Sequence, residues 1–476
     1  MEWVGLVLLL LVGLGIVLTG LPAVVVLFAV ASLGAVIGVL TDAIPVALLT
    51  ALPSRLINLL ENDLLQALPL YVALGLLLDR LPVADALYRT SVAMLPRRAS
   101  APLFSGMLLG ALLGPMNGSV GASVIGLSRV VAPRLTAQGV APATRDAVIA
   151  VASTLGVLVP PSLVLILLSD AMLGAHTIAV TATGRNDRVI NTLDIFHSAL
   201  APAGILLALF LALSWFAGRS QTAAPPRSPL TRREALLAFL SFIFLIALLG
   251  GVAAGYFYAV EAAALGAFAL FCGGVFSGIL TPRVLRALLG DAIALSGALF
   301  SLLLAATSLT LILRLLGTDR LVNNLVASIP GGDTAAVAVV LGVIALCAFV
   351  LDAFEIIFVI VPIVIPPLLI RVADARWVAV LVLLTLQASF LLPPFGYALM
   401  IMRGAAKNPA PFRAFLRALM PFLMAQWLLL LLVLAVPKLV HVGEDQQANT
   451  RAPVAPLSDD DFKNALPPLP DPTDPQ

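Results

Sequence analysis

Residues 114–126 read GPMNGSVGASVIG, a polar and glycine-rich stretch inside an otherwise apolar segment. Its glycines and Pro115 break a helix, and a break inside a membrane exposes backbone N–H and C=O groups that hydrocarbon cannot satisfy. Asn117, Ser119 and Ser123 add oxygen atoms at the break, and hard cations are bound by oxygen ligands. The stretch therefore predicts a cation site. Close helix packing through small residues is the alternative.

A second polar interruption occurs in the other half of the chain, where residues 349–358 read FVLDAFEIIF. Asp352 and Glu355 are three residues apart and share one face if this segment is helical. Carboxylates in apolar runs cost a few kcal/mol at the bilayer centre and are functional by default. The alternative is a structural ion pair between each carboxylate and an arginine.

The two interruptions belong to an internal repeat. Shifting the first half by 233 residues aligns three prolines, namely Pro133 with Pro366, Pro160 with Pro393 and Pro161 with Pro394. The same shift sets Ser119 against Asp352. Many transporters are built from inverted repeats, and interrupted segments at corresponding positions point to the binding site. The repeat predicts a secondary transporter with two re-entrant hairpins, near 103–133 and near 336–367.

A double proline follows each interruption, in STLGVLVPPS (153–162) and in LQASFLLPPFG (386–396). The prolines remove backbone donors and free carbonyl groups in the preceding turn. We therefore expect an ion and substrate site between the breaks, whereas Tyr397 and Phe395 are expected to be packing aromatics. The candidate binding residues are Asn117, Gly118, Ser119, Ser123, Ser153, Thr154, Gly156, Pro160, Pro161, Asp352, Glu355, Gln387, Ser389, Pro393, Pro394 and Gly396.

The composition is that of a membrane protein. Hydrophobic residues make up 61% of the chain and charged residues 11%, with a mean hydropathy of +1.10, whereas soluble domains carry about 25% charged residues. Apolar runs follow one another almost without pause, which predicts roughly eleven to thirteen membrane elements. Because the backbone must satisfy its own hydrogen bonds in lipid, we expect an all-α polytopic fold.

Two polar segments divide the chain. Residues 219–234 (RSQTAAPPRSPLTRRE) carry four arginines and three prolines, which predicts a basic cytoplasmic linker. The first membrane half is then 1–218 and the second 235–441. Residues 442–476 are rich in Pro, Asp and Asn and are predicted to be a disordered tail. The first apolar stretch has no basic flank before it, so we interpret it as an anchor and not as a cleaved signal peptide.

These motifs resemble the large membrane subunit of the tripartite ATP-independent periplasmic (TRAP) transporters, within the wider ion-transporter superfamily. The resemblance covers most of 67–422. It is carried by MNGSVGASVIGLSRVVAPRLTAQGV with STLGVLVPPSLVLILLSDA, and by LDAFEIIFVIVPIVIPPL with LQASFLLPPFGYALMIMRG. The second half most resembles the branch labelled for mannitol, chloroaromatic or keto-acid substrates.

The resemblance implies a mechanism and partners. TRAP permeases use a sodium gradient to import organic anions, commonly carboxylates or sugar acids, which a periplasmic binding protein delivers. A small four-helix membrane subunit, expected here as a separate polypeptide, completes the scaffold in the bacterial inner membrane. Transport resembles an elevator, and the hairpin tips would lie around 117–123 and 352–355. Sodium would bind at Ser119, Thr154 and Gly156, and at Asp352 and Ser389; no other cofactor is implied.

The sequence departs from the family pattern at three places. Many relatives have a Ser-Gly-Ser-Ser tip where this chain has Asn117-Gly118-Ser119-Val120, and they often have Thr where Leu392 precedes the second double proline. Both changes alter the oxygen atoms available to an ion. A polar insertion at 175–194 is longer than in typical members, and the resemblance assigns it no role.

Other functional classes fit less well. The sequence contains no G-x-x-x-x-G-K-[ST] segment for a nucleotide, and its three histidines form no H-E-x-x-H pair, so neither an ATP-driven pump nor an enzyme is expected. A channel, or a carrier that works without a binding protein, stays open because broken helices also build selectivity filters. Channel flux would need neither a sodium gradient nor a binding protein.

Overall fold

The computed structural model describes residues 2–61, 63–96, 98–117, 119–185, 188–219, 230–393, 396–406 and 409–442. Every regular element in these ranges is a helix. Nine of the described helical stretches are long and apolar enough to cross a membrane, a tenth is a pair bent by 61° at its break, and three more apolar helices are shorter. The predicted all-α polytopic fold is confirmed.

The described residues of the first half form twelve elements before the basic segment. They are α1 (Glu2–Thr19), α2 (Ala23–Leu40), α3 (Val46–Leu49), α4 (Ala51–Leu60), α5 (Asp63–Arg80), α6 (Val83–Met94), α7 (Ser100–Leu113), η1 (Gly114–Met116), α8 (Val120–Ala137), α9 (Pro142–Leu158), α10 (Leu163–Thr183) and α11 (Thr192–Arg219).

The second half is built from a similar series. Its elements are α12 (Arg232–Ala253), α13 (Ala259–Phe276), α14 (Pro282–Leu315), α15 (Thr318–Ala327), α16 (Asp333–Cys347), α17 (Ala353–Glu355), η2 (Ile356–Ile360), α18 (Val361–Arg371), α19 (Ala375–Phe390), α20 (Tyr397–Ala405), α21 (Phe412–Ala435) and η3 (Pro437–Val440).

The helix bounds follow the repeat that the prolines indicated. Adding 233 to the bounds of α7, α8 and α9 gives 333–346, 353–370 and 375–391, against Asp333–Cys347 for α16, Ala353–Arg371 for the run from α17 to α18, and Ala375–Phe390 for α19. Each half thus has a helix–break–helix unit followed by a helix that ends at a double proline. The re-entrant placement of these units in a bilayer stays a prediction.

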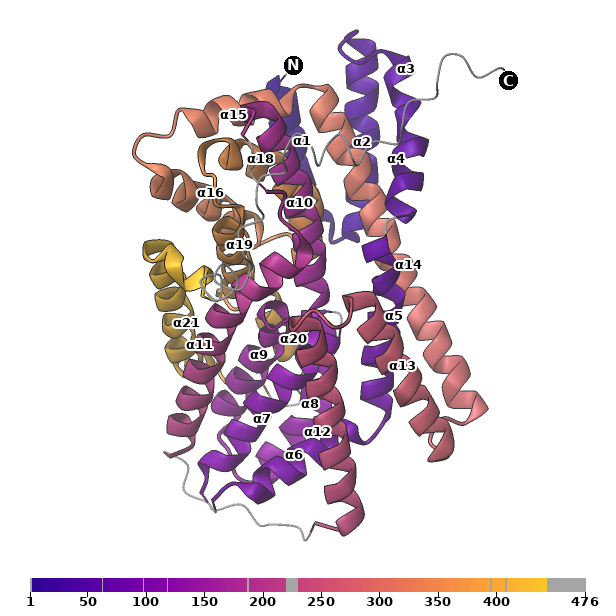
Figure 1. Ribbon diagram of the computed structural model, residues 1–476, viewed down its shortest axis with the longest axis vertical. Helices are drawn as coiled ribbons and strands as arrows, with labels where there is room; N and C mark the ends of the chain where they lie inside the picture. Colours follow the sequence, from indigo (N-terminus) through magenta and orange to yellow (C-terminus); the bar gives the residue numbers. More distant parts are fainter. Residues whose placement is uncertain are drawn as a thin grey trace, which may run out of the picture. The chain divides into compact units, whose positions relative to one another are not determined.

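The two halves are interlocked. In each half the helix after the double proline packs on the second arm of the other half's helix–break–helix unit: α10 packs on α18, and α20 packs on α8 (Figure 1). Helix α9 lies at the centre of the first unit, in contact with α7, η1 and α8. The long helix α14 packs against α2 and α5 and also touches η2. This arrangement places the first break against α9 and the second break against α10 and α14.

Local chemistry sets the ends of the predicted polar segments. Helix α12 begins at Arg232 because Thr231 and Glu234 form a capping box, so the last residues of the predicted linker are helical. Helix α10 continues to Thr183 and stops at Gly184, whose φ of 63° suits glycine, so much of the predicted insertion is also helical. Residues 220–229 of the linker and 443–476 of the tail lie outside the described residues.

Candidate functional site

The first break is an ordered turn between α7 and α8. Helix α7 gives way to the short 3₁₀ turn η1, and α8 begins after Ser119, which has extended backbone angles (φ −148°, ψ 154°). The Ser119 Oγ accepts a hydrogen bond from the Ala122 N–H at 3.1 Å and so caps α8. Gly118 lies outside the described residues.

The remaining polar groups of the tip are joined to each other. The Ser123 hydroxyl donates to the carbonyl O of Ser119 at 3.1 Å, and the Asn117 Nδ2 donates to the Ser123 Oγ at 3.3 Å. Ser123 is 1% exposed. The structure therefore brings together three of the residues predicted at this site, and Asn117, the departure from the family pattern, closes the turn through its amide.

Glycines let other backbones approach this turn closely. A Cβ atom on Gly114 would lie 2.8 Å from the backbone N of Gly156 on α9, and a Cβ atom on Gly75 of α5 would lie 3.0 Å from the carbonyl O of Met116. Side chains at these positions would force the helices apart. The alternative interpretation, close packing through small residues, is thus correct for these glycines, and it holds alongside a site.

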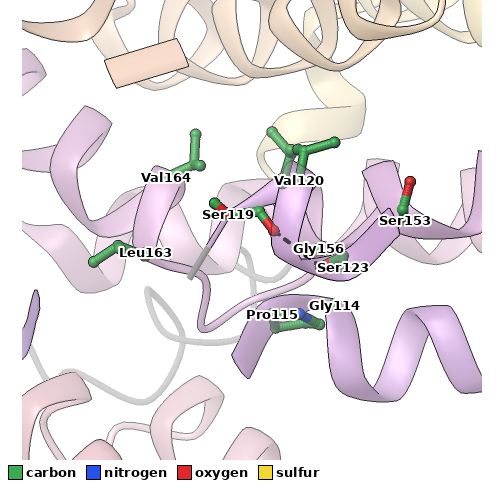
Figure 2. A pocket seen from close by; sticks show the side chains of 10 residues that line it. Gly114, Pro115, Ser119, Val120, Ser123, Ser153, Gly156, Leu163 and Val164 are labelled. Atoms are coloured by element: carbon green, nitrogen blue, oxygen red, sulfur yellow. Dashed lines mark hydrogen bonds between the residues drawn. The ribbon is translucent and has the colours of Figure 1, made fainter. Parts of the chain in front are cut away.

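A small cavity lies between the turn, the end of α9 and the start of α10 (Figure 2). Its volume is about 10 Å³, which is the space for one water molecule or one ion of similar size. The residues that line it are Gly114, Pro115, Ser119, Val120, Ser123, Ser153, Gly156, Val157, Leu163 and Val164. Four of the predicted binding residues, Ser119, Ser123, Ser153 and Gly156, therefore meet around one cavity.

The double proline leaves one carbonyl on this cavity without its helical donor. In a continuous helix the carbonyl O of Gly156 would accept from the N–H of residue 160, and Pro160 has none. The next carbonyl, that of Val157, would lose its donor to Pro161 in the same way, but the Ser162 hydroxyl donates to it at 3.0 Å. The Pro160–Pro161 peptide bond is cis.

Two of the predicted hydroxyls are already engaged within α9. The Ser153 Oγ donates to the Ala150 carbonyl O at 2.7 Å, and the Thr154 Oγ1 donates to the Val151 carbonyl O at 2.8 Å. Both side chains are fully buried. Their oxygen lone pairs stay available to a cation, but only Ser153 lines the cavity, so the predicted role of Thr154 as a sodium ligand gains no support from this geometry.

The second break places its two carboxylates at a helix start. Asp352 precedes α17 as its N-cap, and the Asp352 backbone N–H donates to the Glu355 Oε2 at 2.5 Å. Glu355 is 7% exposed. Among the described residues no arginine or lysine lies within ion-pair distance of either carboxylate. The structural ion pair that the sequence left open is therefore absent from the described part of the chain.

Tyr397 packs between α19 and α8. Its ring packs against Phe390, the last residue of α19, with 6.2 Å between centroids. A Cβ atom on Gly121 of α8 would lie 2.9 Å from its hydroxyl oxygen. These contacts fit a packing aromatic, and they place the start of α20 against the arm that follows the first break.

The residues around the second double proline are only partly organised as predicted. The Ser389 hydroxyl donates to the Thr385 carbonyl O at 2.7 Å. Gln387 is fully buried, and neither polar atom of its amide has a hydrogen-bond partner among the described residues. A Cβ atom on Gly396 would lie 2.6 Å from the carbonyl O of Phe390, so only glycine fits there. Pro393 ends the turn, and Pro394 and Phe395 lie outside the described residues.

Sequence reasoning missed a larger cavity beside the second unit. It has a volume of about 300 Å³ and lies between α10, α14 and the run from η2 to α18. Asp170, Thr307 and Arg314 line it. The signal was present in part, because Asp170 interrupts the apolar run of α10, and an ionisable residue in such a run is a candidate functional residue.

Comparison with known proteins decides the family. The model of the family described as "Tripartite ATP-independent periplasmic transporter, DctM component" matches residues 5–439. The chain belongs to this family. The predicted resemblance is confirmed: this DctM-family chain is a multi-pass inner-membrane permease component of a tripartite transporter, and it is not an enzyme.

Relatives of the DctM component support this assignment over most of the chain. The C4-dicarboxylate TRAP transporter large permease protein of Pseudomonas aeruginosa is 22% identical over 396 residues, 81% of this chain and 87% of that protein. The corresponding protein of Rhodobacter capsulatus is 26% identical over 229 residues, so the match spans only 47% of this chain and 51% of that relative. The sialic acid TRAP transporter large permease protein of Vibrio cholerae is 20% identical over 386 residues, 80% and 86% of the two chains.

Solved structures share the DctM-family fold at low sequence identity. The crystal structure of the Alcanivorax borkumensis YdaH transporter superimposes with a TM-score of 0.59 at 13% identity, over 82% of this chain and 88% of that one. The Neisseria gonorrhoeae MtrF structure gives a TM-score of 0.54 at 12% identity, over 82% and 84%. At these identities the likeness concerns the fold alone.

Proposed function

We propose that this chain is the large permease subunit of a sodium-coupled TRAP transporter that imports an organic anion, a carboxylate or a keto or sugar acid. A periplasmic binding protein delivers the anion, and a small four-helix membrane subunit, made as a separate polypeptide, completes the scaffold. The relatives named for C4-dicarboxylates and for sialic acid both transport organic acids by their names. The cargo of this chain is therefore proposed only as a class.

One observation carries the sodium part of the proposal, namely the cavity of about 10 Å³ between the first break and α9. Sodium in transporters is coordinated by unwound backbone carbonyls and by the C-terminal ends of broken helices. This cavity lies at such a helix end, since Gly156 is in the last turn of α9 before the double proline, and Ser119 and Ser123 add hydroxyl oxygens. Its volume suits one ion, and its lining contains no basic side chain that would repel a cation.

The second half offers a less complete ion site. Asp352 and Glu355 bring negative charge to the second break, and among the described residues no cation neutralises them. Ser389, the other residue predicted to hold sodium there, directs its hydroxyl proton to Thr385 within α19. We propose that the charge of Asp352 attracts a second cation, while Glu355 holds the helix start through its hydrogen bond from the Asp352 N–H.

Cross-packing of the halves supports movement of the two breaks as one body. Because α10 packs on α18 and α20 packs on α8, the arm of each unit is held by a helix from the other half. A shift of one unit therefore carries the other with it. We propose that this body moves against a scaffold that includes α5 and α14, as in an elevator, and that cation binding at both breaks sets when it moves.

The experiment that tests the function is reconstitution. The chain and its candidate small subunit are placed in liposomes, and uptake of pooled labelled organic acids is measured with and without an inward sodium gradient and with and without the binding protein. Replacement of sodium by choline at equal ionic strength is the control. Uptake that requires both the gradient and the binding protein supports the proposal.

The alternative is a channel or a carrier that works alone. Uptake that ignores both sodium and the binding protein favours a channel and contradicts the proposal. Uptake that needs sodium but not the binding protein favours a stand-alone secondary carrier, in which case the ion sites stand and the tripartite partnership is wrong.

A further inference from the structure

A groove of about 510 Å³ lies between α12, α13 and the corner where α5 meets α6. This volume is in the range of small-molecule sites. Its walls are mostly apolar, with Leu81 at the corner, Leu236 and Leu240 on α12 and Leu270 on α13. Leu236 and Leu240 are 58% and 56% exposed. Because α12 and α13 are both long and apolar enough to cross a membrane, the groove opens to lipid.

The groove runs inward from one surface of the membrane. Arg233 is the second residue of α12, and it belongs to the basic segment 219–234, which is predicted to be cytoplasmic. The lining of the groove on α12 extends from Arg233 to Ser241, which is roughly 12 Å along a helix axis. Half of the hydrocarbon core of a bilayer is about 15 Å thick. The depth of the groove therefore suits one acyl chain of the cytoplasmic leaflet.

The surface end of the groove carries an uncompensated positive charge. Asp85, Arg233 and Glu234 line the groove there, in the first turns of α6 and α12. The Asp85 carboxylate forms an ion pair with Arg134. The Glu234 carboxylate forms an ion pair with Arg89. Arg233 is exposed and, in the described part of the chain, has no ion-pair partner. Its guanidinium is therefore available to an anionic group at the mouth of the groove.

The equivalent helix pair in the other half is in close contact. The shift of 233 residues relates α1 to α12 and α6 to α15, and α1 packs on α15 as α12 packs on α6. A Cβ atom on Gly5 of α1 would overlap the Oγ1 of Thr318 on α15. The equivalent residues of the groove-bearing pair are Ala238 on α12 and Asp85 on α6. An unfilled apolar groove loses dispersion contacts along its walls, so the open pair favours an occupant from the bilayer.

We propose that this groove binds an anionic glycerophospholipid, with one acyl chain in the groove and the phosphate at Arg233. Arginine matches a phosphate in two parallel hydrogen bonds, and basic pockets between membrane helices on the cytoplasmic side bind anionic lipid headgroups. The lipid lies against α6, which connects α5 to the α7–α8 unit and packs on both α12 and α7 (Figure 1). The site depends neither on the cargo nor on the coupling ion.

The test is lipid binding to the purified chain with its small subunit in a neutral detergent, measured by native mass spectrometry during titration with phosphatidylglycerol. Wild type is expected to bind phosphatidylglycerol more tightly than phosphatidylcholine, which has no net charge. Arg233→Gln is expected to weaken phosphatidylglycerol binding about fivefold, the effect of one basic residue near an anionic membrane surface. Arg413→Gln is the matched control and should bind as wild type does, because Arg413 is also the exposed second residue of a helix, α21, and does not line the groove.

A variant that fills the groove tests the position of the acyl chain. Gly273 of α13 lines the groove, and a Cβ atom built there meets nothing within 4 Å. Gly273→Leu should therefore abolish the preference for phosphatidylglycerol over phosphatidylcholine. Gly290→Leu, at an open position of α14 that does not line the groove, should leave this preference unchanged.

Three results would overturn the lipid site. Equal phosphatidylglycerol binding by wild type, Arg233→Gln and Gly273→Leu would mean that the groove is not where the lipid binds. Equal affinity of wild type for phosphatidylglycerol and phosphatidylcholine would contradict recognition of an anionic headgroup. Binding by the chain alone, but not by its complex with the small subunit, would show that the small subunit and not a lipid covers the groove.

Discussion

Gly114 and Gly156 meet backbone to backbone at the first break. A Cβ atom on Gly114 would lie 2.8 Å from the N and 2.9 Å from the Cα of Gly156, and a Cβ atom on Gly156 would overlap the carbonyl group of Gly114. The two residues also line the small cavity. Their contact therefore sets both the spacing of α7 and α9 and the size of the proposed ion site.

Gly156→Ala should damage packing and sodium response together. Overpacking of a tight contact typically costs about 1–3 kcal/mol, and the displaced Gly114 carbonyl would change the cavity. We expect a lower thermal unfolding midpoint in detergent and a loss of the stabilisation that added sodium gives. Gly204→Ala is the control, because its Cβ meets nothing within 4 Å. Equal behaviour of the two variants would contradict this account of the contact.

Ser119→Ala separates helix capping from ion binding. The Ser119 Oγ caps α8 at 3.1 Å and also lines the cavity. Loss of a cap costs about 1 kcal/mol, and loss of a ligand should raise the sodium concentration for half-maximal uptake severalfold. Thr281→Ala removes the comparable cap of α14, where the Val284 N–H donates to Thr281 Oγ1 at 3.4 Å. If both variants lower stability and neither changes the sodium dependence of uptake, Ser119 is a cap only.

The repeat explains how much of this site could be predicted from the sequence. Prolines and polar breaks at one offset correctly predicted paired elements, because a missing N–H ends or bends a helix wherever it occurs. The halves diverge after their double prolines: α10, which follows the first, runs for 21 residues, whereas α20, which follows the second, ends at Ala405. Pro409 and Pro411 follow there and have no counterpart in α10.

Contacts between distant segments could not be predicted in the same way. Tyr397 looks like a packing aromatic in its own segment, and only the fold shows that its hydroxyl lies against Gly121 of α8. Asp170 and Arg314 likewise stand in separate apolar helices, and the cavity between them arises from the packing of α10, α14 and α18. The periodicity of one segment does not indicate which residues of other segments lie beside it. The helix breaks could be predicted because they depend on the residues of one segment alone.

Substitutions at Asp352 and Glu355 should distinguish charge from hydrogen bonding. Glu355→Gln keeps an oxygen that can accept from the Asp352 N–H, which now lies 2.5 Å from Glu355 Oε2. We expect this variant to transport at close to the wild-type rate, and Glu355→Ala to lose stability. Asp352→Asn removes the charge proposed to attract a cation and should lower sodium-driven uptake at least tenfold.

Membrane abundance of each carboxylate variant, measured by quantitative blotting, provides the control for these uptake rates. If Asp352→Asn shows normal abundance and normal uptake, Asp352 is not part of the ion site. A strong uptake defect in Glu355→Gln would show that transport requires the charge of Glu355 and not only its hydrogen bond with the Asp352 N–H.

Arg371 should be required for the stability of the second unit. Its Nη1 donates to the carbonyl O atoms of Val326 at 3.3 Å and Ile329 at 3.0 Å, and its Nη2 donates to that of Gly331. These bonds tie the end of α18 to the segment that precedes α16. Hydrogen bonds to a charged group contribute about 1.5–3 kcal/mol each, and lysine lacks the planar fork that makes several at once.

Arg371→Lys should therefore lower the unfolding midpoint in detergent by several degrees, whereas Arg417→Lys, at an exposed position of α21, should leave it unchanged. An Arg371→Lys protein as stable as wild type would mean that packing of α10 and α15 on α18 holds the unit without these bonds.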